Sequence, residues 1–184
     1  MLRIVSGTVG GRRLKTPKGV EIRPTQDRIK QVIFNSLIEI VEGASVLDLF
    51  GGTGSLGLES LSRGAEKALF VEREIRCVGA IKENVALCGF DAQSRIVRQD
   101  VNEFVAHPTG EQFDIVFADP PYEKIRSSLD ESPFLQAVQP WVKPDGLFVW
   151  EHFSGQRLKE PKGWTIVRDR DYGETGLTFL RPQG

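Results

Sequence analysis

The chain has 184 residues and a formal net charge of −1, and 40% of its residues are hydrophobic. This length suits one domain with a small appendage, and the composition is typical of a globular protein. No apolar run approaches the roughly 20 residues of a membrane span, and charges and glycines interrupt residues 1–19, where a signal peptide would need an apolar core.

The few cysteines and histidines exclude two further classes of protein. Cys77 and Cys88 are too few for a disulfide framework, and with His107 and His152 they form no metal-ligand spacing. Both cysteines fall on one predicted helix, where a buried free thiol is the expected role. We therefore expect no metal and a reducing, cytoplasmic location.

The small net charge hides an asymmetry along the chain. Residues 1–30 carry eight basic and two acidic side chains, whereas the other 154 residues carry 16 basic and 23 acidic ones. A basic arm on an acidic body predicts contact with a polyanion such as a nucleic acid. A solvated tail that happens to be basic is the alternative.

The first elements in chain order are a hairpin and a helix. Residues 2–6 and 12–15 predict a short hairpin with glycines between them. A helix is then expected to begin at Thr25, which suits the N-cap, with Asp27 in its first turn. Apolar residues recur at helical spacing after it, and the helix is expected to end at Gly43.

From residue 45 onward, predicted strands and helices alternate. The expected strands are Ser45–Leu49, Ala68–Val71, Arg95–Arg98, Phe113–Phe117 and Gly146–Glu151. The expected helices are Ser55–Ser62, Arg73–Leu87, Val101–Ala106 and Ser127–Val138, in which Pro133 must start a turn or interrupt the helix. Apolar strands alternating with helices predict a parallel sheet that is covered on both faces.

The end of the chain differs from this alternation. Trp164–Arg168 and Leu177–Arg181 flank a turn with no helix between them, which predicts a closing antiparallel hairpin. The sequence thus predicts an α/β fold with a mostly parallel seven-stranded sheet, a C-terminal antiparallel hairpin and a small N-terminal β-hairpin extension.

Ligands of an open α/β sheet bind outside the carboxyl ends of its strands. A glycine-rich loop follows the first strand there, and Gly52, Gly54 and Gly57 match the dinucleotide-binding fingerprint. Glu72 ends the second strand, 20 residues after Gly52, and could accept two hydrogen bonds from a ribose diol. This motif alone is weak, so a nicotinamide or flavin enzyme competes with an S-adenosylmethionine enzyme.

A stiff corner follows the fourth strand, at Asp119-Pro120-Pro121-Tyr122. Each proline fixes its φ angle, so the carbonyls of Asp119 and Pro120 are held in place. The Asp119 carboxylate and the Pro120 carbonyl could both accept from one NH₂ group, and Tyr122 could stack on the ring that carries it. The alternative is an ordinary turn. A site that binds an NH₂ group has no part in hydride transfer, and Asp48 suits the ammonium of an amino-acid moiety. We therefore favour an S-adenosylmethionine enzyme over a nicotinamide or flavin enzyme.

Four blocks together carry a family resemblance. They are Arg3-Ile4 with Gly10 to Leu14, Arg23-Pro24-Thr25 with Asp27-Arg28 and Phe34-Asn35, Phe50 to Glu59, and Asp119 to Tyr122. With these blocks the chain resembles class I S-adenosylmethionine-dependent methyltransferases, which have a Rossmann-like fold. More narrowly, it is similar to the bacterial RsmD family, which methylates the guanine N2 amine in 16S ribosomal RNA of the small subunit. The N-terminal blocks are the specific part, and Gly52 departs from the alanine common in the family.

The resemblance implies S-adenosyl-L-methionine as cofactor and no metal, and it assigns roles to residues. The implied cofactor contacts are Asp48, Phe50, Gly51, Gly52, Thr53, Gly54, Glu72, Arg73, Asp100, Val101 and Thr25. Thr25 is one of the weaker candidates, as is Phe34, because a helix cap and a core residue explain them equally well. The implied catalytic residues are Asp119, Pro120, Pro121 and Tyr122.

The resemblance also implies a division of the chain and a partner. Residues 1–24 would be a basic arm that contacts RNA, and residues 25–184 the catalytic domain. The candidate RNA contacts are Arg12, Arg13, Lys15, Arg23, Arg28, Lys124 and Arg126, with a solvated loop as the alternative for the last two. The expected partner is 16S ribosomal RNA within an assembled or assembling small subunit, bound by a monomer without a membrane.

Several functions remain open beside this one. An adenine-N6 DNA methyltransferase uses a similar corner, but such enzymes usually carry a large target-recognition segment. The motif of protein glutamine-N5 methyltransferases resembles Asn-Pro-Pro-Tyr, whereas this chain has Asp-Pro-Pro-Tyr. From other classes, an NAD-dependent oxidoreductase and a non-catalytic RNA-binding protein with this fold are the alternatives.

Overall fold

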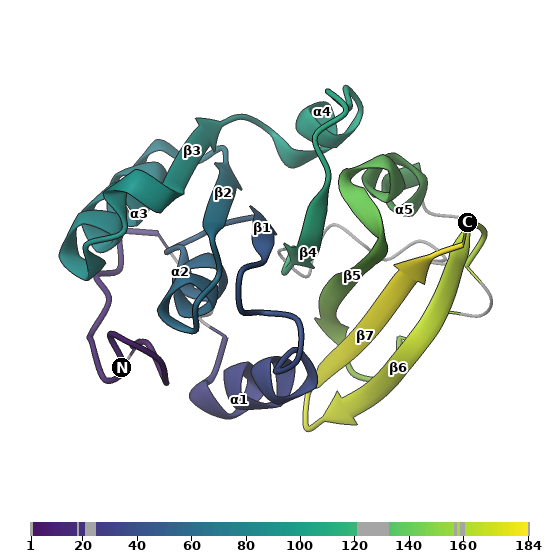
Figure 1. The fold of residues 1–184 in the computed structure, drawn as a ribbon, viewed down its shortest axis with the longest axis horizontal. Coiled ribbons are helices and arrows are strands. Elements are labelled where there is room, and N and C mark those ends of the chain that lie inside the picture. The colour runs from purple at the N-terminus through teal and green to yellow at the C-terminus, as the bar shows by residue number, and fades with distance from the viewer. Residues whose placement is uncertain are drawn as a thin grey trace. The chain divides into compact units, whose positions relative to one another are not determined.

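The computed structural model describes residues 2–17, 19–20, 25–120, 133–156, 158 and 161–183 (Figure 1). The chain forms two compact units, residues 1–101 and residues 102–184. Within the described ranges, no helix is long and apolar enough to cross a membrane.

Unit 1 is built on three parallel strands in the order β3-β2-β1. These strands are β1 (Ser45–Leu49), β2 (Lys67–Glu72) and β3 (Ser94–Arg98), close to the expected ranges. Its helices are α1 (Asp27–Ser36), α2 (Ser55–Ser62), α3 (Ile75–Cys88) and the one-turn 3₁₀ helix η1 (Asp91–Gln93). Every residue of β1 is buried, as expected for a strand with covered faces.

The first helix differs from its prediction at both ends. Gln26, not Thr25, is the N-cap of α1, with an extended backbone and no side-chain capping hydrogen bond. The helix ends at Ser36 instead of Gly43, and the amide of Val41 then donates to the carbonyl of Leu37 across a turn at 3.0 Å. Leu37 and Val41 stay buried, so the turn satisfies the apolar spacing that had indicated a longer helix.

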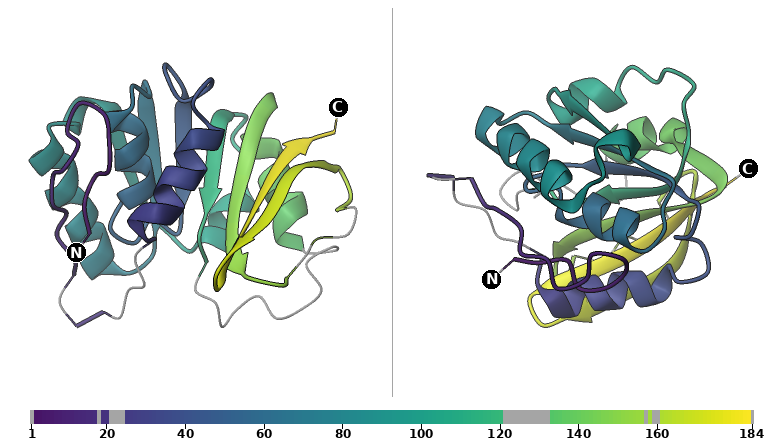
Figure 2. Two further views of the ribbon diagram at one scale, coloured as in Figure 1. Left: turned by 90° about the horizontal axis from the view of Figure 1, so that it is seen from below. Right: turned by 60° about the vertical axis from the view of Figure 1, so that its left-hand side comes forward.

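Unit 2 holds four strands in the order β4-β5-β7-β6. They are β4 (Phe113–Ala118), β5 (Val142–Phe153), β6 (Trp164–Tyr172) and β7 (Thr175–Pro182). β4 and β5 are parallel, whereas β7 pairs antiparallel with both β5 and β6, which confirms the closing hairpin (Figure 2). Among the described residues of this unit, the helices are α4 (Val101–Val105), which begins at the unit boundary, α5 (Pro133–Val138) and the 3₁₀ helix η4 (Gln139–Trp141).

Two details of unit 2 refine the prediction. β5 begins at Val142 rather than Gly146, and its pairing with β4 shifts register between Phe113 and Ile115, where β5 carries the extra residues. Pro133 is the first residue of α5, where its missing N–H costs nothing. The rest of the predicted helix, residues 127–132, lies outside the described residues.

Tryptophans hold the core of unit 2 together. The ring of Trp141 stacks on Phe104 with centroids 4.4 Å apart, and its Nε1 donates to the carbonyl of Val105 at 3.1 Å. Trp164 is buried likewise, and its Nε1 donates to the carbonyl of Leu135 at 3.2 Å. A buried indole needs such a partner for its N–H, so these bonds fix how the short helices pack.

Candidate functional site

The glycine loop joins β1 to α2 through residues that need unusual backbone angles. Gly52 and Gly54 have φ angles of 56° and 79°, and Gly54 is the N-cap of α2. The amide of Gly51 donates to the carbonyl of Val71 at 3.0 Å, which ties the loop to β2. Phe50 also has a positive φ of 61°, which is strained for a bulky side chain and is common at functional sites.

The third glycine of the fingerprint serves close packing and not ligand contact. A Cβ on Gly57 would lie 2.3 Å from Cε1 of Phe70, so only glycine fits between α2 and β2. Its amide donates to Oδ2 of the buried Asp48 at 2.9 Å. Asp48 therefore fixes the first turn of α2 beneath the glycine loop.

The carboxylate of Glu72 is held at the end of β2 by three main-chain amides. Oε2 accepts from Gly52 at 2.9 Å, and Oε1 accepts from Arg73 at 2.7 Å and from Glu74 at 2.8 Å. The fold thus brings together Gly52 and Glu72, which the sequence had paired by spacing alone. Such a fixed carboxylate is pre-organised to accept hydrogen bonds from a diol.

Arg73 and Asp100 follow the carboxyl ends of β2 and β3 in unit 1. Nη1 of Arg73 lies 3.5 Å from Oδ2 of Asp100, and both side chains are more than one-third exposed. An exposed pair of this kind contributes about 0–1 kcal/mol, so it leaves Asp100 able to change partners. Val101 is buried at the start of α4, and Thr25 is buried just before α1.

Phe34, the other weaker candidate, has the contacts of a core residue. Its side chain is fully buried in α1, and the guanidinium carbon of Arg63 lies 4.7 Å from its ring centroid. These contacts favour the core alternative for Phe34.

The segment predicted to bind an NH₂ group, residues 119–122, begins where β4 ends in unit 2. Ala118 pairs with Trp150 in the parallel register of β4 and β5, and Asp119 and Pro120 follow at the carboxyl end of β4. Asp119 is half-buried and Pro120 is buried. The predicted residues Pro121, Tyr122, Lys124 and Arg126 lie outside the described residues, as does Arg23 of the arm.

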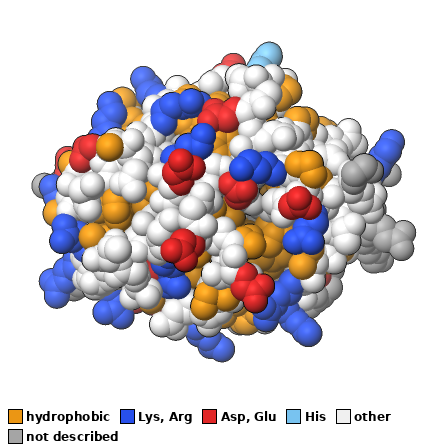
Figure 3. Space-filling view, viewed as in Figure 1, with side chains coloured by type: hydrophobic (Ala, Val, Ile, Leu, Met, Phe, Trp, Pro, Cys, Tyr) orange, Lys and Arg blue, Asp and Glu red, His pale blue; other side chains and the backbone are white. Residues whose placement is uncertain are grey.

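The N-terminal arm pairs with itself as a hairpin. Arg3 and Arg13 form an antiparallel bridge, and the amide of Ile4 donates to the carbonyl of Arg12 at 2.9 Å. Apolar side chains of the arm point inward, because Ile4 and Leu14 are buried. The basic side chains are exposed, namely Arg3, Arg12, Arg13 and Lys15, with Arg28 following on α1. Lys and Arg side chains are spread around the rim of the face in Figure 3, including the lower left, where Figure 1 draws the N-terminal arm.

Two of these basic side chains also contact α3. The Arg12 guanidinium donates to the carbonyl of Leu87, and Nζ of Lys15 lies 2.8 Å from Oε2 of Glu83. The Lys15–Glu83 pair is mostly exposed, and such a pair contributes only about 0–1 kcal/mol. The arm therefore lies against the helices of unit 1 (Figure 2) and still presents cations to solvent.

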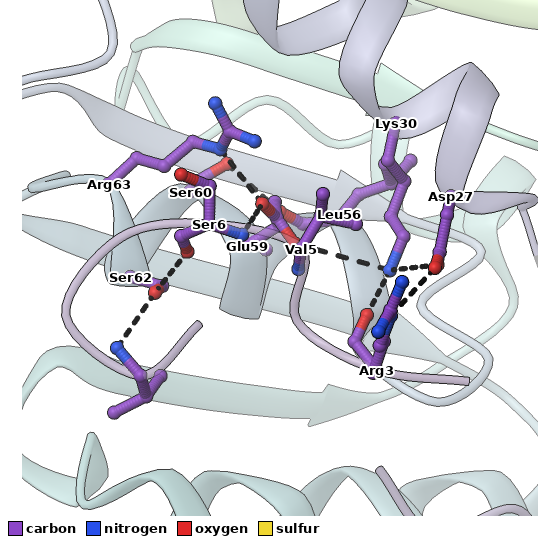
Figure 4. A network of polar contacts seen from close by, with 12 residues as sticks. Arg3, Val5, Ser6, Asp27, Lys30, Leu56, Glu59, Ser60, Ser62 and Arg63 are labelled. Carbon is purple, nitrogen blue, oxygen red and sulfur yellow. Dashed lines mark hydrogen bonds and ion pairs between the residues drawn. The ribbon is translucent and has the colours of Figure 1, made fainter. Parts of the chain in front are cut away.

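A buried carboxylate anchors the first strand of the arm (Figure 4). Glu59 of α2 is fully buried, and its Oε2 accepts from the amide of Val5 at 2.6 Å. Its Oε1 accepts from the amide of Ser6 at 3.0 Å and from Nε of Arg63 at 2.8 Å. Nζ of Lys30, which is also fully buried, lies 4.0 Å from Oε2.

Lys30 completes the network from α1. Its ammonium donates to the carbonyl of Arg3 and lies 3.8 Å from Oδ1 of Asp27. Burial lowers the pKa of Lys30, and the nearby Glu59 and Asp27 oppose that shift. This network thus holds the arm through its main chain, at the amides of Val5 and Ser6 and the carbonyl of Arg3.

Ser62 holds the turn of the arm in the same way. Its Oγ donates to the carbonyl of Ser6 at 2.6 Å and accepts from the amide of Val9 at 3.2 Å. Sequence reasoning missed Glu59, Lys30 and Ser62. The available signal was a charged residue within a helix, Lys30 next to the apolar positions of α1 and Glu59 in α2, all of whose residues are buried.

Two buried cysteines lie on α3. Cys77 and Cys88 are free thiols, about 16 Å apart along the helix axis at 1.5 Å per residue, so they cannot form a disulfide with each other. Burial, reinforced by the nearby Glu72 and Glu74, raises the pKa of Cys77 to about 11, and burial raises the pKa of Cys88 as well. Among the described residues, no group of three or more His, Cys, Asp or Glu side chains is placed to hold a metal.

We expect the native protein to resist iodoacetamide at pH 8. The thiolate is the reacting species, so the raised pKa should slow alkylation of Cys77 about 100-fold relative to an ordinary cysteine. Mass spectrometry of time points, with a urea-unfolded sample as control, measures this rate. Equal rates for folded and unfolded protein would contradict the burial of the thiol.

Comparisons with known proteins extend over the whole chain. A model of the family described as "Conserved hypothetical protein 95" matches residues 2–181. The chain is 32% identical to ribosomal RNA small subunit methyltransferase D of Escherichia coli (strain K12), over 98% of this chain and 89% of that protein. Its identity to the protein of the same name from Haemophilus influenzae is also 32%, over 94% of this chain and 89% of that protein.

A solved structure has the same fold. The methyltransferase candidate yhhF from Escherichia coli superposes with a TM-score of 0.84 at 29% identity, covering 100% of this chain and 98% of that chain. The predicted α/β, Rossmann-like methyltransferase fold is thereby confirmed, with parallel strands followed by the antiparallel C-terminal hairpin. From the match over residues 2–181 and the identity to these relatives, we conclude that the chain belongs to the "Conserved hypothetical protein 95" family, the family of ribosomal RNA small subunit methyltransferase D.

Proposed function

We propose that this protein transfers a methyl group from S-adenosyl-L-methionine to the exocyclic N2 amine of a guanine in 16S ribosomal RNA, of the guanine(966) type. The observation that carries the proposal is the likeness, over nearly the full length of both chains, to proteins named ribosomal RNA small subunit methyltransferase D. Family membership sets aside the NAD-dependent oxidoreductase and the non-catalytic RNA-binding protein.

The residues of unit 1 suit this cofactor. Glu72 is held rigidly beside Gly52, where it can accept from ribose hydroxyls. The loop from Gly51 to Gly54 has no Cβ at three of its four positions, so a ligand can approach its backbone closely. The Asp100 carboxylate, which pairs with the exposed Arg73, suits recognition of the adenine amino group. The cofactor supplies a methyl group activated by a sulfonium.

The residues of unit 2 suit the nucleophile. Guanine N2 is a weak nucleophile because its lone pair is delocalised into the ring. Hydrogen bonds from its two N–H groups to the Asp119 carboxylate and the Pro120 carbonyl would raise the electron density on nitrogen and orient the lone pair. Most of the acceleration then comes from positioning and fixed dipoles. Tyr122 would stack on the base, which must be unpaired or flipped out to expose N2.

The arm, residues 1–24, is proposed to bind RNA phosphates as part of a monomeric enzyme. Arg12, Arg13 and Lys15 lie exposed on the hairpin, and contacts of this kind provide affinity and salt dependence more than sequence choice. Free thiols and a ribosomal substrate, naked or within a small subunit, fit a cytoplasmic location.

The proposal predicts the product of one assay. Small ribosomal subunits from a strain lacking this protein should gain N2-methylguanosine when incubated with the protein and S-adenosylmethionine. Nucleoside mass spectrometry and mapping of the modified fragment identify the base and the position. Calorimetry should show binding of S-adenosylmethionine and no tight binding of NAD. N6-methyladenosine or methylglutamine as the product would refute the guanine assignment.

A further inference from the structure

One buried amide joins the arm to the glycine loop. Asn84 lies in the middle of α3 and is fully buried. Its Oδ1 accepts from the amide of Lys15 at 2.8 Å, and its Nδ2 donates to the carbonyl of Lys15 at 3.0 Å. The same Nδ2 donates its other hydrogen to the carbonyl of Thr53 at 3.0 Å. Both hydrogens of the Asn84 amide are therefore in use.

The two partners of Asn84 belong to segments with different proposed ligands. Lys15 ends the arm hairpin, next to Leu14, which pairs with Leu2. Thr53 is buried between Gly52, which bonds to Glu72, and Gly54, which caps α2. Asn84 itself is not expected to contact either ligand. It does bond to the backbone of both segments that are expected to bind one.

The geometry of an amide makes these contacts interdependent. The carboxamide group is planar, so its two N–H bonds and its oxygen move as one rigid unit. A shift of the Lys15 backbone tilts this plane and misaligns the bond to Thr53. Water cannot replace a lost partner readily, because the side chain is fully buried. Ordering either segment therefore favours the ordered arrangement of the other.

We propose that Asn84 is a positioning residue that couples RNA binding by the arm to cofactor binding by the glycine loop. The inference rests on the proposed function, since it needs the arm to bind RNA and the loop to bind S-adenosylmethionine. Linkage requires the coupling to be reciprocal, so each ligand should raise the affinity for the other by the same factor. We expect a factor of about 5 or more, the lower end of typical allosteric coupling.

The decisive measurement is a ratio of dissociation constants. The Kd of S-adenosylhomocysteine is measured with and without saturating unmethylated small ribosomal subunits, for the wild type and for Asn84→Asp. Aspartate keeps the acceptor for the Lys15 amide and loses both donors. The ratio should fall from about 5 to about 1 in the variant. A merely structural role would weaken binding in both states and leave the ratio unchanged, which would overturn the proposal.

Glu83→Gln is the matched control. It removes the other contact between Lys15 and α3, at the neighbouring residue and on the exposed surface. Its ratio should equal that of the wild type. A ratio that falls equally in both variants would place the coupling in the Lys15 side chain and would refute the role of Asn84.

A measurement on the wild type keeps the test independent of how well the variant folds. S-adenosylhomocysteine alone should slow hydrogen exchange at the Lys15 amide several-fold, although it contacts only the loop. Unchanged exchange at Lys15 with the ligand bound would overturn the coupling and leave the proposed function intact. Absence of any S-adenosylhomocysteine binding would instead refute the proposed function.

Discussion

Replacing Asp119 by alanine should abolish methyl transfer while cofactor binding survives. The carboxylate is proposed to accept a hydrogen bond from guanine N2 as charge develops on nitrogen, and removing one such fixed group typically costs about 100- to 1000-fold in kcat. Asp119 is proposed to contact the guanine base and not the cofactor. We therefore expect the Kd of S-adenosylmethionine to stay within about twofold of the wild type, because no interaction with the cofactor is removed.

Asp114→Asn is the matched control for this prediction. Asp114 lies on the same strand and is also half-buried, but its carboxylate pairs with Nζ of Lys143 at 2.9 Å. Single-turnover assays with unmethylated small subunits, alongside calorimetry of cofactor binding, separate chemistry from binding. Normal turnover by Asp119→Ala would remove Asp119 from the reaction, and an equal loss in Asp114→Asn would point to damage of the strand.

Replacing Glu59 by glutamine should lower the free energy of unfolding more than any other single isosteric change in the polar network that holds the arm. The Glu59 oxygens accept from three donors, while the fully buried Lys30 lies 4.0 Å away. An amide has only one oxygen, so its NH₂ group must face either the Val5 amide or the pair of donors on the other side. Lys30 also loses its closest buried counter-charge, and breaking a buried pair in this way costs about 3–5 kcal/mol.

Urea unfolding monitored by tryptophan fluorescence measures this loss, and hydrogen exchange locates it. Exchange at the amides of Val5 and Ser6 should accelerate more than exchange within β1. Lys30→Met in the Glu59→Gln background provides the control, because removing both charges leaves neither unpaired. The double variant should lose less free energy of unfolding than the sum of the losses measured for Glu59→Gln and Lys30→Met alone. A change below about 1 kcal/mol in Glu59→Gln would show that the network adds little to the net stability.

The sequence by itself determined the order and type of the main elements. Ser45–Leu49 and Ser55–Ser62 formed with the predicted bounds, because a short apolar strand, a glycine turn and the helix that follows it are each encoded locally. The glycine fingerprint also placed Glu72 at a strand end by spacing alone. The helix from Thr25 was wrong at both ends, since apolar residues at helical spacing also satisfy a buried turn, as Leu37 shows.

Only the tertiary structure decided which side chains hold the arm and connect it to the glycine loop. Asn84 bonds to residues 69 and 31 positions away, and Glu59 bonds to amides more than 50 positions away. No local pattern encodes such pairs, because a polar residue within a helix gives no sign of whether it faces water or a distant backbone. Their roles follow from burial, which forces each polar group to find a partner, and burial is a property of the folded chain.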